Sequence, residues 1–195
     1  MIINPIIDIK KENRTRSSDA YSQLFSERII FVFGEINDEM SGSVISQLLL
    51  LDSLNHKDIY LYLNSPGGSV SAGLSIADTM NFIQSDVCVV AIGFVASIAA
   101  VILASGAKGK RYCLKNADIM IHQPSTSCSG TTTSITTASK RILNISDRVY
   151  NLLSETTGKD KKTIEIDCLN DFYMTSQEAI DYGIVDKIIE KRKEE

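Results

Sequence analysis

A serine at the head of an apolar helix is the first residue whose setting could support chemistry. Ser97 lies in "GFVASIAAVILASGAKG" (93–109), at a predicted junction between a strand and a helix. The first amides of a helix lack helical acceptors and lie at the positive end of its dipole, so they can stabilise an oxyanion. A serine packed in a small-residue helix is the more common explanation of such a pattern. This segment alone therefore does not establish a nucleophile.

Two further features could serve such a serine. The glycine pair in "NSPGGSV" (64–70) follows a predicted strand, and it forms either a tight turn or a loop that presents bare amides to a ligand. His122 ends the apolar run "IMIH" and could act as a general base for Ser97, although a satisfied core histidine is the ordinary explanation. The carboxylates whose type would suit a third member are Asp167, Asp171 and Asp181.

Other candidate chemistries have less support. "GLSIA" (73–77) departs from the GxSxG pattern at its last glycine and falls within a predicted helix, so Ser75 is rejected as a nucleophile. Cys113, in a predicted strand, and Cys128, in a Ser/Thr-rich loop, could in principle pair with a histidine, but neither has surroundings that activate a thiol. His56 falls at a helix end and is most simply a capping residue. The chain has no GxxxxGK[ST] motif, so any ATP dependence must come from a partner.

Composition limits the class of protein. The 195 residues are 44% hydrophobic and 23% charged, which suits one globular domain, and the net charge of −4 gives no indication of a nucleic-acid or anionic-membrane surface. No apolar stretch approaches the roughly 18 residues of a membrane span, and the N-terminus does not resemble a signal peptide. The cysteines lack CxxC spacing, which predicts free thiols in the cytoplasm and no metal site. They are Cys88, Cys113, Cys128 and Cys168.

The elements that must position these residues alternate along the chain. Strands are predicted over 28–34, 58–64, 87–93, 111–114, 118–122 and 183–191, and helices over 38–54, 70–83, 98–105, 132–157 and 176–182. Apolar strands separated by helices predict an α/β fold with a parallel sheet. Residues 1–19 are mostly polar and predict a flexible arm.

Five segments closely resemble the family of Clp protease proteolytic subunits (ClpP). They are "RIIFVFGEINDEM", "DIYLYLNSPGGSVSAGLSIADTM", "VASIAAVILASGAKGKRYCL", "IMIHQPS" and "MTSQEAIDYGIVDKII". The resemblance runs in order from about residue 5 to the C-terminus. It implies a crotonase-like α/β spiral of repeated β-β-α units. It further implies an axial arm over 1–19, a single peptidase domain over 20–195 and a protruding handle over about 123–157, made of the helix predicted from about residue 132 and the Ser/Thr/Gly-rich segment before it.

The resemblance also implies the catalytic roles. By position, Ser97 is the nucleophile, His122 the general base and Asp171 the carboxylate that orients the imidazole. The oxyanion hole consists of the backbone amides of Gly68 and Ile98. The implied activity is that of a serine endopeptidase that degrades unfolded polypeptides.

Partners follow from the same resemblance. Subunits of this family assemble into two stacked seven-membered rings around a chamber. An AAA+ unfoldase of the ClpX, ClpA or ClpC type hydrolyses ATP and feeds in unfolded chains, so this chain needs no cofactor of its own. The residues implied for unfoldase docking, for each of which ordinary core packing is the alternative, are Tyr60, Tyr62, Phe82, Tyr112, Leu114 and Ile189.

The chain departs from the family at several positions. The nucleophile segment 93–99 reads Gly-Phe-Val-Ala-Ser-Ile-Ala where the family usually has Gly-Gln-Ala-Ala-Ser-Met-Gly, and the stiff Ile98 side chain could narrow the substrate pocket. The handle begins with threonines, which weaken helix formation. Asn170 replaces an arginine that pairs across the ring interface in many members. These changes suggest a divergent paralogue that could need a second ring subunit for activity. Acyl-CoA chemistry on a crotonase-like spiral is a third possibility, and the triad matches count against it.

Overall fold

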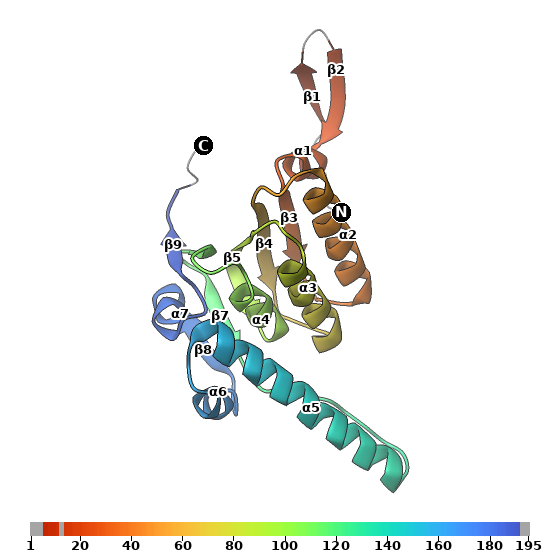
Figure 1. Ribbon diagram of the computed structural model, residues 1–195, viewed down its shortest axis with the longest axis vertical. Helices are drawn as coiled ribbons and strands as arrows, with labels where there is room; N and C mark the ends of the chain where they lie inside the picture. Colours follow the sequence, from red (N-terminus) through yellow and green to blue (C-terminus); the bar gives the residue numbers. More distant parts are fainter. Residues whose placement is uncertain (1–5, 12–13, 192–195) are drawn as a thin grey trace.

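The N-terminal part of the chain is a hairpin followed by a short helix. The computed structural model describes residues 6–11 and 14–191, with side chains described from Asp19 onward. β1 (Ile6–Lys11) and β2 (Arg14–Asp19) pair antiparallel, and α1 (Ala20–Ser26) follows. The sequence predicted a flexible arm here, because β2 is wholly polar and the isoleucines of β1 do not alternate regularly with polar residues. Figure 1 shows the hairpin standing away from the main sheet.

The main sheet is parallel, as the sequence predicted, apart from one strand. Its path is β3 (Ile29–Phe33), β4 (Ile59–Ser65), β5 (Val87–Ala96), β6 (Arg111–Leu114) and β9 (Lys187–Ile189). β7 (Asp118–Ile121) pairs parallel with the end of β5, and β8 (Phe172–Thr175) pairs antiparallel with β7. The antiparallel β8 was not predicted, because its four residues "FYMT" are too short for a periodic signal.

β5 pairs with two different strands along its length, first with β6 and then with β7. Its first part pairs with β6 through Val89, and its last part pairs with β7 through Phe94. Gly93 lies between the two parts with φ +66°, a conformation that favours glycine. The strand therefore runs on to Ala96, three residues beyond the predicted end, and delivers the chain to Ser97.

Helices cover one face of the sheet. They are α2 (Asp38–Leu54), α3 (Val70–Phe82) and α4 (Ile98–Ala104). Asn37 caps α2 by accepting a hydrogen bond from the Met40 amide, and Ser69 caps α3 by accepting one from the Ala72 amide. Each residue of α4 is buried, so this helix forms the centre of the core. Because α3 begins at Val70 and α4 begins at Ile98, the positions of the residues just before these two helices are fixed as well.

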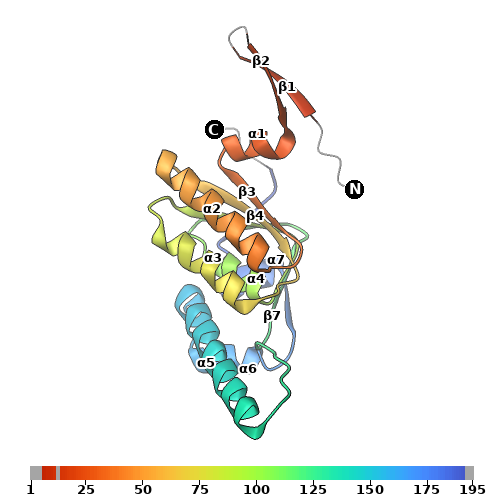
Figure 2. The same cartoon turned by 90° about the vertical axis from the view of Figure 1, so that its right-hand side faces the viewer.

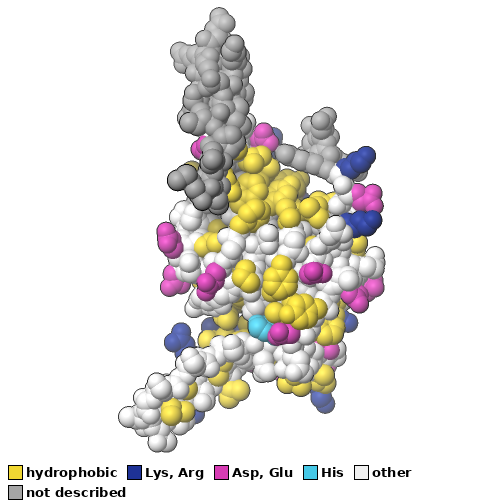
Figure 3. All heavy atoms as spheres, turned by 180° about the vertical axis from the view of Figure 1, so that it is seen from behind, with side chains coloured by type: hydrophobic (Ala, Val, Ile, Leu, Met, Phe, Trp, Pro, Cys, Tyr) yellow, Lys and Arg dark blue, Asp and Glu magenta, His cyan; other side chains and the backbone are white. Residues whose placement is uncertain are grey.

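The opposite face of the sheet remains partly open in the single chain. Side chains of β4 alternate between buried and half-buried, and Tyr60 and Tyr62 are on the half-buried side. The Phe31 ring packs against Tyr62 at 5.7 Å between ring centroids, and Phe33 is 43% exposed. Figure 3 shows hydrophobic side chains gathered over the upper part of this face. Parallel sheets are usually covered on both faces, so this uncovered face is available to a partner.

A long helix projects from the domain. α5 (Thr132–Thr157) extends well beyond the other helices in both ribbon views (Figures 1 and 2), and within it only Val149 and Leu153 are buried. The β-branched threonines did not prevent its first turns, and Thr131 caps the helix by accepting a hydrogen bond from the Ser134 amide. Gly158, with φ +76°, ends the helix as the sequence predicted.

The C-terminal region differs in detail from the prediction. α6 (Lys161–Asp167) was not predicted, and α7 (Ser176–Tyr182) begins with the predicted capping box. The strand predicted over 183–191 shrinks to β9, because Gly183 ends α7 and the next residues run as a connection to Asp186.

Candidate active site

Ser97 occupies the junction between β5 and α4 in an unusual backbone conformation. Its φ is +58°, and within residues 19–191 it shares a positive φ with only one other non-glycine residue, Arg28. The Ser97 amide donates to the Met120 carbonyl at 2.9 Å, which ties the junction to β7. Such a conformation costs of order 1 kcal/mol and persists only where the surroundings impose it. The hydroxyl is thereby directed toward β7 and does not cap α4.

The Ser97 hydroxyl meets an imidazole, and the imidazole meets a carboxylate. The Ser97 Oγ lies 2.9 Å from His122 Nε2, and His122 Nδ1 lies 2.9 Å from Asp171 Oδ1. With the proton on Nδ1, the imidazole donates to Asp171 and accepts the Ser97 proton. The side chains of His122 and Asp171 are 30% and 55% exposed, so the site is open to solvent.

The β7–β8 pair explains why these two residues meet. Ile121 pairs with Phe172, so the next residues outward, His122 and Asp171, lie opposite each other. Sequence reasoning did not distinguish Asp171 by type from the other two carboxylates. The structure separates them, because Asp167 accepts from the Tyr182 hydroxyl and Asp181 from the Gln177 side chain.

Gln123 reinforces this arrangement, and sequence reasoning missed it. Its amide donates to the Cys168 carbonyl at 2.7 Å, and its side chain donates to the Leu169 carbonyl at 3.0 Å. These bonds join the residue after His122 to the turn before Asp171. The adjacent "HQP" letters are the only sequence signal for this role.

The glycine pair lies against Ser97. Gly67 has φ +96°, and a Cβ at this position would lie 2.7 Å from the Cβ of Ser97. Gly68 has φ +146°, and a Cβ there would lie 2.2 Å from the Ile36 carbonyl oxygen. Neither position can accept a side chain. Ile98 is the first residue of α4, so its amide has no intrahelical acceptor.

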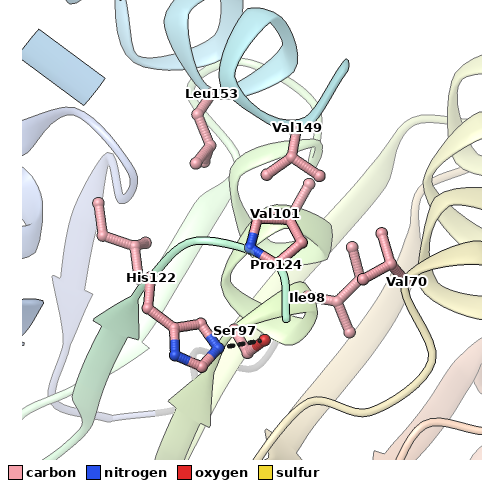
Figure 4. Close-up of a pocket in the computed structure, with 9 residues that line it drawn as sticks. Val70, Ser97, Ile98, Val101, His122, Pro124, Val149 and Leu153 are labelled. Carbon is pink, nitrogen blue, oxygen red and sulfur yellow. Dashed lines mark hydrogen bonds between the residues drawn. The ribbon is translucent and has the colours of Figure 1, made fainter. Parts of the chain in front are cut away.

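An apolar pocket opens beside Ser97 and His122 (Figure 4). Its apolar lining comes from Val70, Ile98, Val101, Ile121, Pro124, Val149 and Leu153. Figure 4 shows Val70 and Ile98 on one side of this pocket, with Val149 and Leu153 projecting toward it from α5. The Ile98 side chain also packs against α3, where a Cβ at Gly73 would lie 2.2 Å from Ile98 Cγ1. Apart from Ser97 and His122, the lining of the pocket is therefore apolar.

The competing candidates have other roles. Burial raises the pKa of the Cys113 thiol, while Cys128 is exposed. Both nitrogens of His122 are already engaged by Ser97 and Asp171, which leaves no Cys–His pair. The Ser75 hydroxyl donates to the Ala72 carbonyl within its own helix. His56 Nδ1 lies 3.1 Å from Asp52 Oδ1, so this histidine pairs with a carboxylate.

Five of the six residues implied for docking lie on strands of the sheet, and the sixth, Phe82, lies at the end of α3. Tyr62 and Tyr112 lie in one row across β5, since both are in register with Val90. Leu114 is directly opposite Ile189 in the β6–β9 pair. Phe82, the last residue of α3, is 81% exposed, and Tyr60 is half-buried.

Within the part of the chain that the structure describes, no group of three His, Cys, Asp or Glu side chains could hold a metal ion. In that same part, every helix falls short of the length and apolarity needed to cross a membrane.

A hydroxyl, an imidazole and a carboxylate joined in this order beside an apolar pocket are characteristic of a serine hydrolase. Residues 10–192 match the family described as Clp protease. The ATP-dependent Clp protease proteolytic subunit of Ligilactobacillus salivarius (strain UCC118) is 45% identical over 194 residues, which cover 99% of this chain and 98% of that protein. The chain belongs to the Clp protease family. The resemblance inferred from its five segments is confirmed.

Proposed function

We propose that this chain is a serine endopeptidase that cleaves unfolded polypeptides into short peptides, with Ser97, His122 and Asp171 as its catalytic residues. The observation that carries the proposal is the chain of two 2.9 Å contacts from the Ser97 hydroxyl through His122 to Asp171. Membership of the Clp protease family supports peptide-bond hydrolysis over other acyl transfers. It also counts against acyl-CoA chemistry on a related spiral.

The geometry supports a two-stage reaction. His122 Nε2 takes the Ser97 proton while Oγ attacks the peptide carbonyl carbon, and Asp171 stabilises the imidazolium that forms. The tetrahedral oxyanion accepts hydrogen bonds from the amides of Gly68 and Ile98. The C–N bond then breaks, and the amine leaves with the proton from His122. Water adds to the resulting acyl-enzyme by the same route and releases the acid.

The apolar pocket supplies the first specificity element. The side chain of the residue before the scissile bond enters between Ile98 and Val149, where it exchanges water for apolar contacts. We therefore expect cleavage after aliphatic or aromatic residues.

The assembly and the partner belong to the same proposal. Two seven-membered rings stack through the α5 handles and enclose a chamber that contains the triads. An AAA+ unfoldase hydrolyses ATP and docks on the partly open sheet face, which presents Tyr62 and Tyr112. The relative's printed name, with its "ATP-dependent" and "proteolytic subunit", supports this division of labour. The compartment that fits such a machine is the cytoplasm.

One observation favours a second candidate, a subunit with little activity alone. Asp171 is 55% exposed, and its neighbour Asn170 carries a neutral side chain that cannot form an ion pair across a ring interface. A second type of ring subunit could then be needed to hold the triad in place.

Hydrolysis of a fluorogenic short peptide tests the proposal. Short peptides reach the chamber without an unfoldase, so the measurement reports on the chemistry alone. The purified chain should cleave the peptide, and Ser97→Ala should remove that activity. Activity that appears only when a second ring subunit is added would favour the second candidate. Activity that survives in Ser97→Ala would contradict both.

A further inference from the structure

Two stacked aromatic rings lie beside the triad, and the chemistry described above does not use them. Phe94 of β5 and Tyr173 of β8 stack with 6.5 Å between their centroids and 18° between their planes. β7 runs between these strands, with Asp118 opposite Phe94 and Met120 opposite Tyr173. The rings therefore reach toward each other across a strand. Tyr173 is 60% exposed, so the pair presents an apolar surface to solvent.

The aromatic stack lies on the same face of the sheet as the carboxylate of Asp171. Side chains alternate along a strand, so Asp171 and Tyr173 project from the same face of the sheet. Phe172 projects the other way and packs against the Tyr182 ring at 5.6 Å. In Figure 3, a small group of hydrophobic side chains borders the histidine near the base of the handle on this face.

The apolar pocket does not include the stack. Its apolar lining comes mainly from α3, α4 and α5, with Val70, Val101 and Val149 among others, and Ile121 of β7 also contributes. Neither ring of the stack is among the residues that line it. His122 must reach both Ser97 and the leaving amine, because it transfers the proton from one to the other. The half of the substrate that departs therefore passes close to His122, whereas the residue before the scissile bond occupies the pocket. The aromatic stack lies outside the pocket and near His122, because Asp171, which binds His122, is two residues before Tyr173.

We propose that Phe94 and Tyr173 form a platform for an apolar or aromatic side chain on the leaving-group side of the scissile bond. This inference rests on the peptidase function proposed above. A substrate side chain laid on the exposed Tyr173 ring removes apolar surface of both groups from water. An aromatic side chain adds a ring contact to that burial. The platform thus selects residues after the cleaved bond, whereas the pocket selects the residue before it.

Two internally quenched peptides test this inference with the full-length assembled enzyme. They are identical up to the scissile bond and carry either two phenylalanines or two serines after it, and mass spectrometry of the products confirms the bond cleaved. The wild type should favour the phenylalanine peptide by about fivefold in kcat/KM. Tyr173→Ser and Phe94→Ala should bring this ratio close to one, whereas Tyr173→Phe, which keeps the ring, should retain it. Phe33→Ala removes another exposed aromatic side chain, on β3, and should also retain the ratio.

Several results would overturn the platform. They are equal cleavage of both peptides by the wild type, an unchanged ratio in Tyr173→Ser, or an equal loss for both peptides in that variant. If Tyr173→Ser changes the mass measured by light scattering and leaves the ratio unchanged, the rings form a contact between copies. Failure of the peptidase function is distinguishable from these results, because then the wild type would cleave neither peptide or Ser97→Ala would still cleave them.

Discussion

The backbone of the glycine pair controls how closely other groups approach the nucleophile. Gly67 and Gly34 both have a positive φ, of +96° and +91°, but only Gly67 lies against Ser97. At Gly34 a Cβ would meet nothing within 4 Å. A side chain at Gly34 would therefore only strain the backbone, whereas a side chain at Gly67 would also crowd Ser97.

We expect Gly67→Ala to lower kcat/KM for a short peptide by about 100-fold, because the new Cβ would displace the Ser97 side chain from His122. Gly34→Ala should lower stability by about 1 kcal/mol and leave kcat/KM close to the wild-type value. Peptide hydrolysis and urea unfolding of both variants are the measurements. Equal losses of activity in both would contradict the proposed crowding.

Thiol reactivity is a second prediction at the scale of single residues. Burial raises the pKa of the Cys88 thiol to about 12 and that of Cys168 to about 12, and Cys113 is also buried, whereas Cys128 is exposed. One thiol of the four in the chain should therefore react rapidly with a maleimide at neutral pH, and Cys128→Ser should abolish that reaction. A second rapidly reacting thiol would contradict this burial pattern.

The residues of the site differ in how far the sequence alone predicted them. Ser97 and His122 carried local signals, a helix start and the end of an apolar strand. Asp171 did not, because its partner depends on a β7–β8 register that the short strand β8 conceals. Only the family resemblance selected it from three similar carboxylates. Gln123 acts through backbone contacts, which leave no pattern in the sequence.

At the scale of elements, one ion pair joins the parts of the chain that surround the core. Arg111 on β6 forms paired hydrogen bonds with Asp186 and donates to the carbonyl of Thr156 near the end of α5. The Arg111 and Asp186 side chains are only 6% and 19% exposed. Burial opposes ionisation of Asp186, but the hydrogen bonds and charge of Arg111 hold its pKa below the ordinary value.

Asp186→Asn should therefore destabilise the protein by about 3 kcal/mol at pH 7, because it leaves a buried arginine without its counter-charge. A carboxyl with a lowered folded pKa contributes stability above its unfolded pKa of about 3.9 and loses it as pH falls through the folded value. The difference between wild type and variant should shrink when urea unfolding is repeated below pH 4. Asp147→Asn, in an exposed pair with Lys161, should change little. A pH-independent difference would contradict this account of Asp186.

Elements were predicted where their hydrophobic period was long. The helices α2, α3 and α5 and the parallel strands β3 to β6 followed from that period and from their caps. The missed elements, β1, β2, α1, α6 and β8, are all short, and their formation depends on what they pair with or pack against. β5 exceeded its predicted end because pairing with β7 outweighed the break that Gly93 indicated.

At the scale of the whole molecule, the handle and the open sheet face both expose apolar side chains in the single chain. α5 projects with Ile135 42% and Leu143 67% exposed, far from the core that its last turns join. Apolar side chains on a projecting helix fit a contact with another protein surface. This arrangement fits the proposed stacking of two rings through their handles.

We expect the wild-type mass from light scattering to correspond to two seven-membered rings. Leu143→Asp should lower it to that of one ring, because a charge replaces an apolar contact. Ile166→Asp is the matched control, since Ile166 is 58% exposed on α6, which packs beside the last turns of α5, and this variant should keep the wild-type mass. An unchanged mass in Leu143→Asp would place the contact between rings elsewhere.

Covalent labelling with a fluorophosphonate tests the central claim most directly. The phosphorus atom forms a bond to the hydroxyl oxygen of an activated serine and releases fluoride, so the adduct marks the nucleophile itself. We predict one adduct per chain, mapped to Ser97 by peptide mass spectrometry, absent in Ser97→Ala and formed more slowly in Asp171→Asn. An adduct at another serine, or labelling of Ser97 that does not depend on Asp171, would contradict the assignment of the triad.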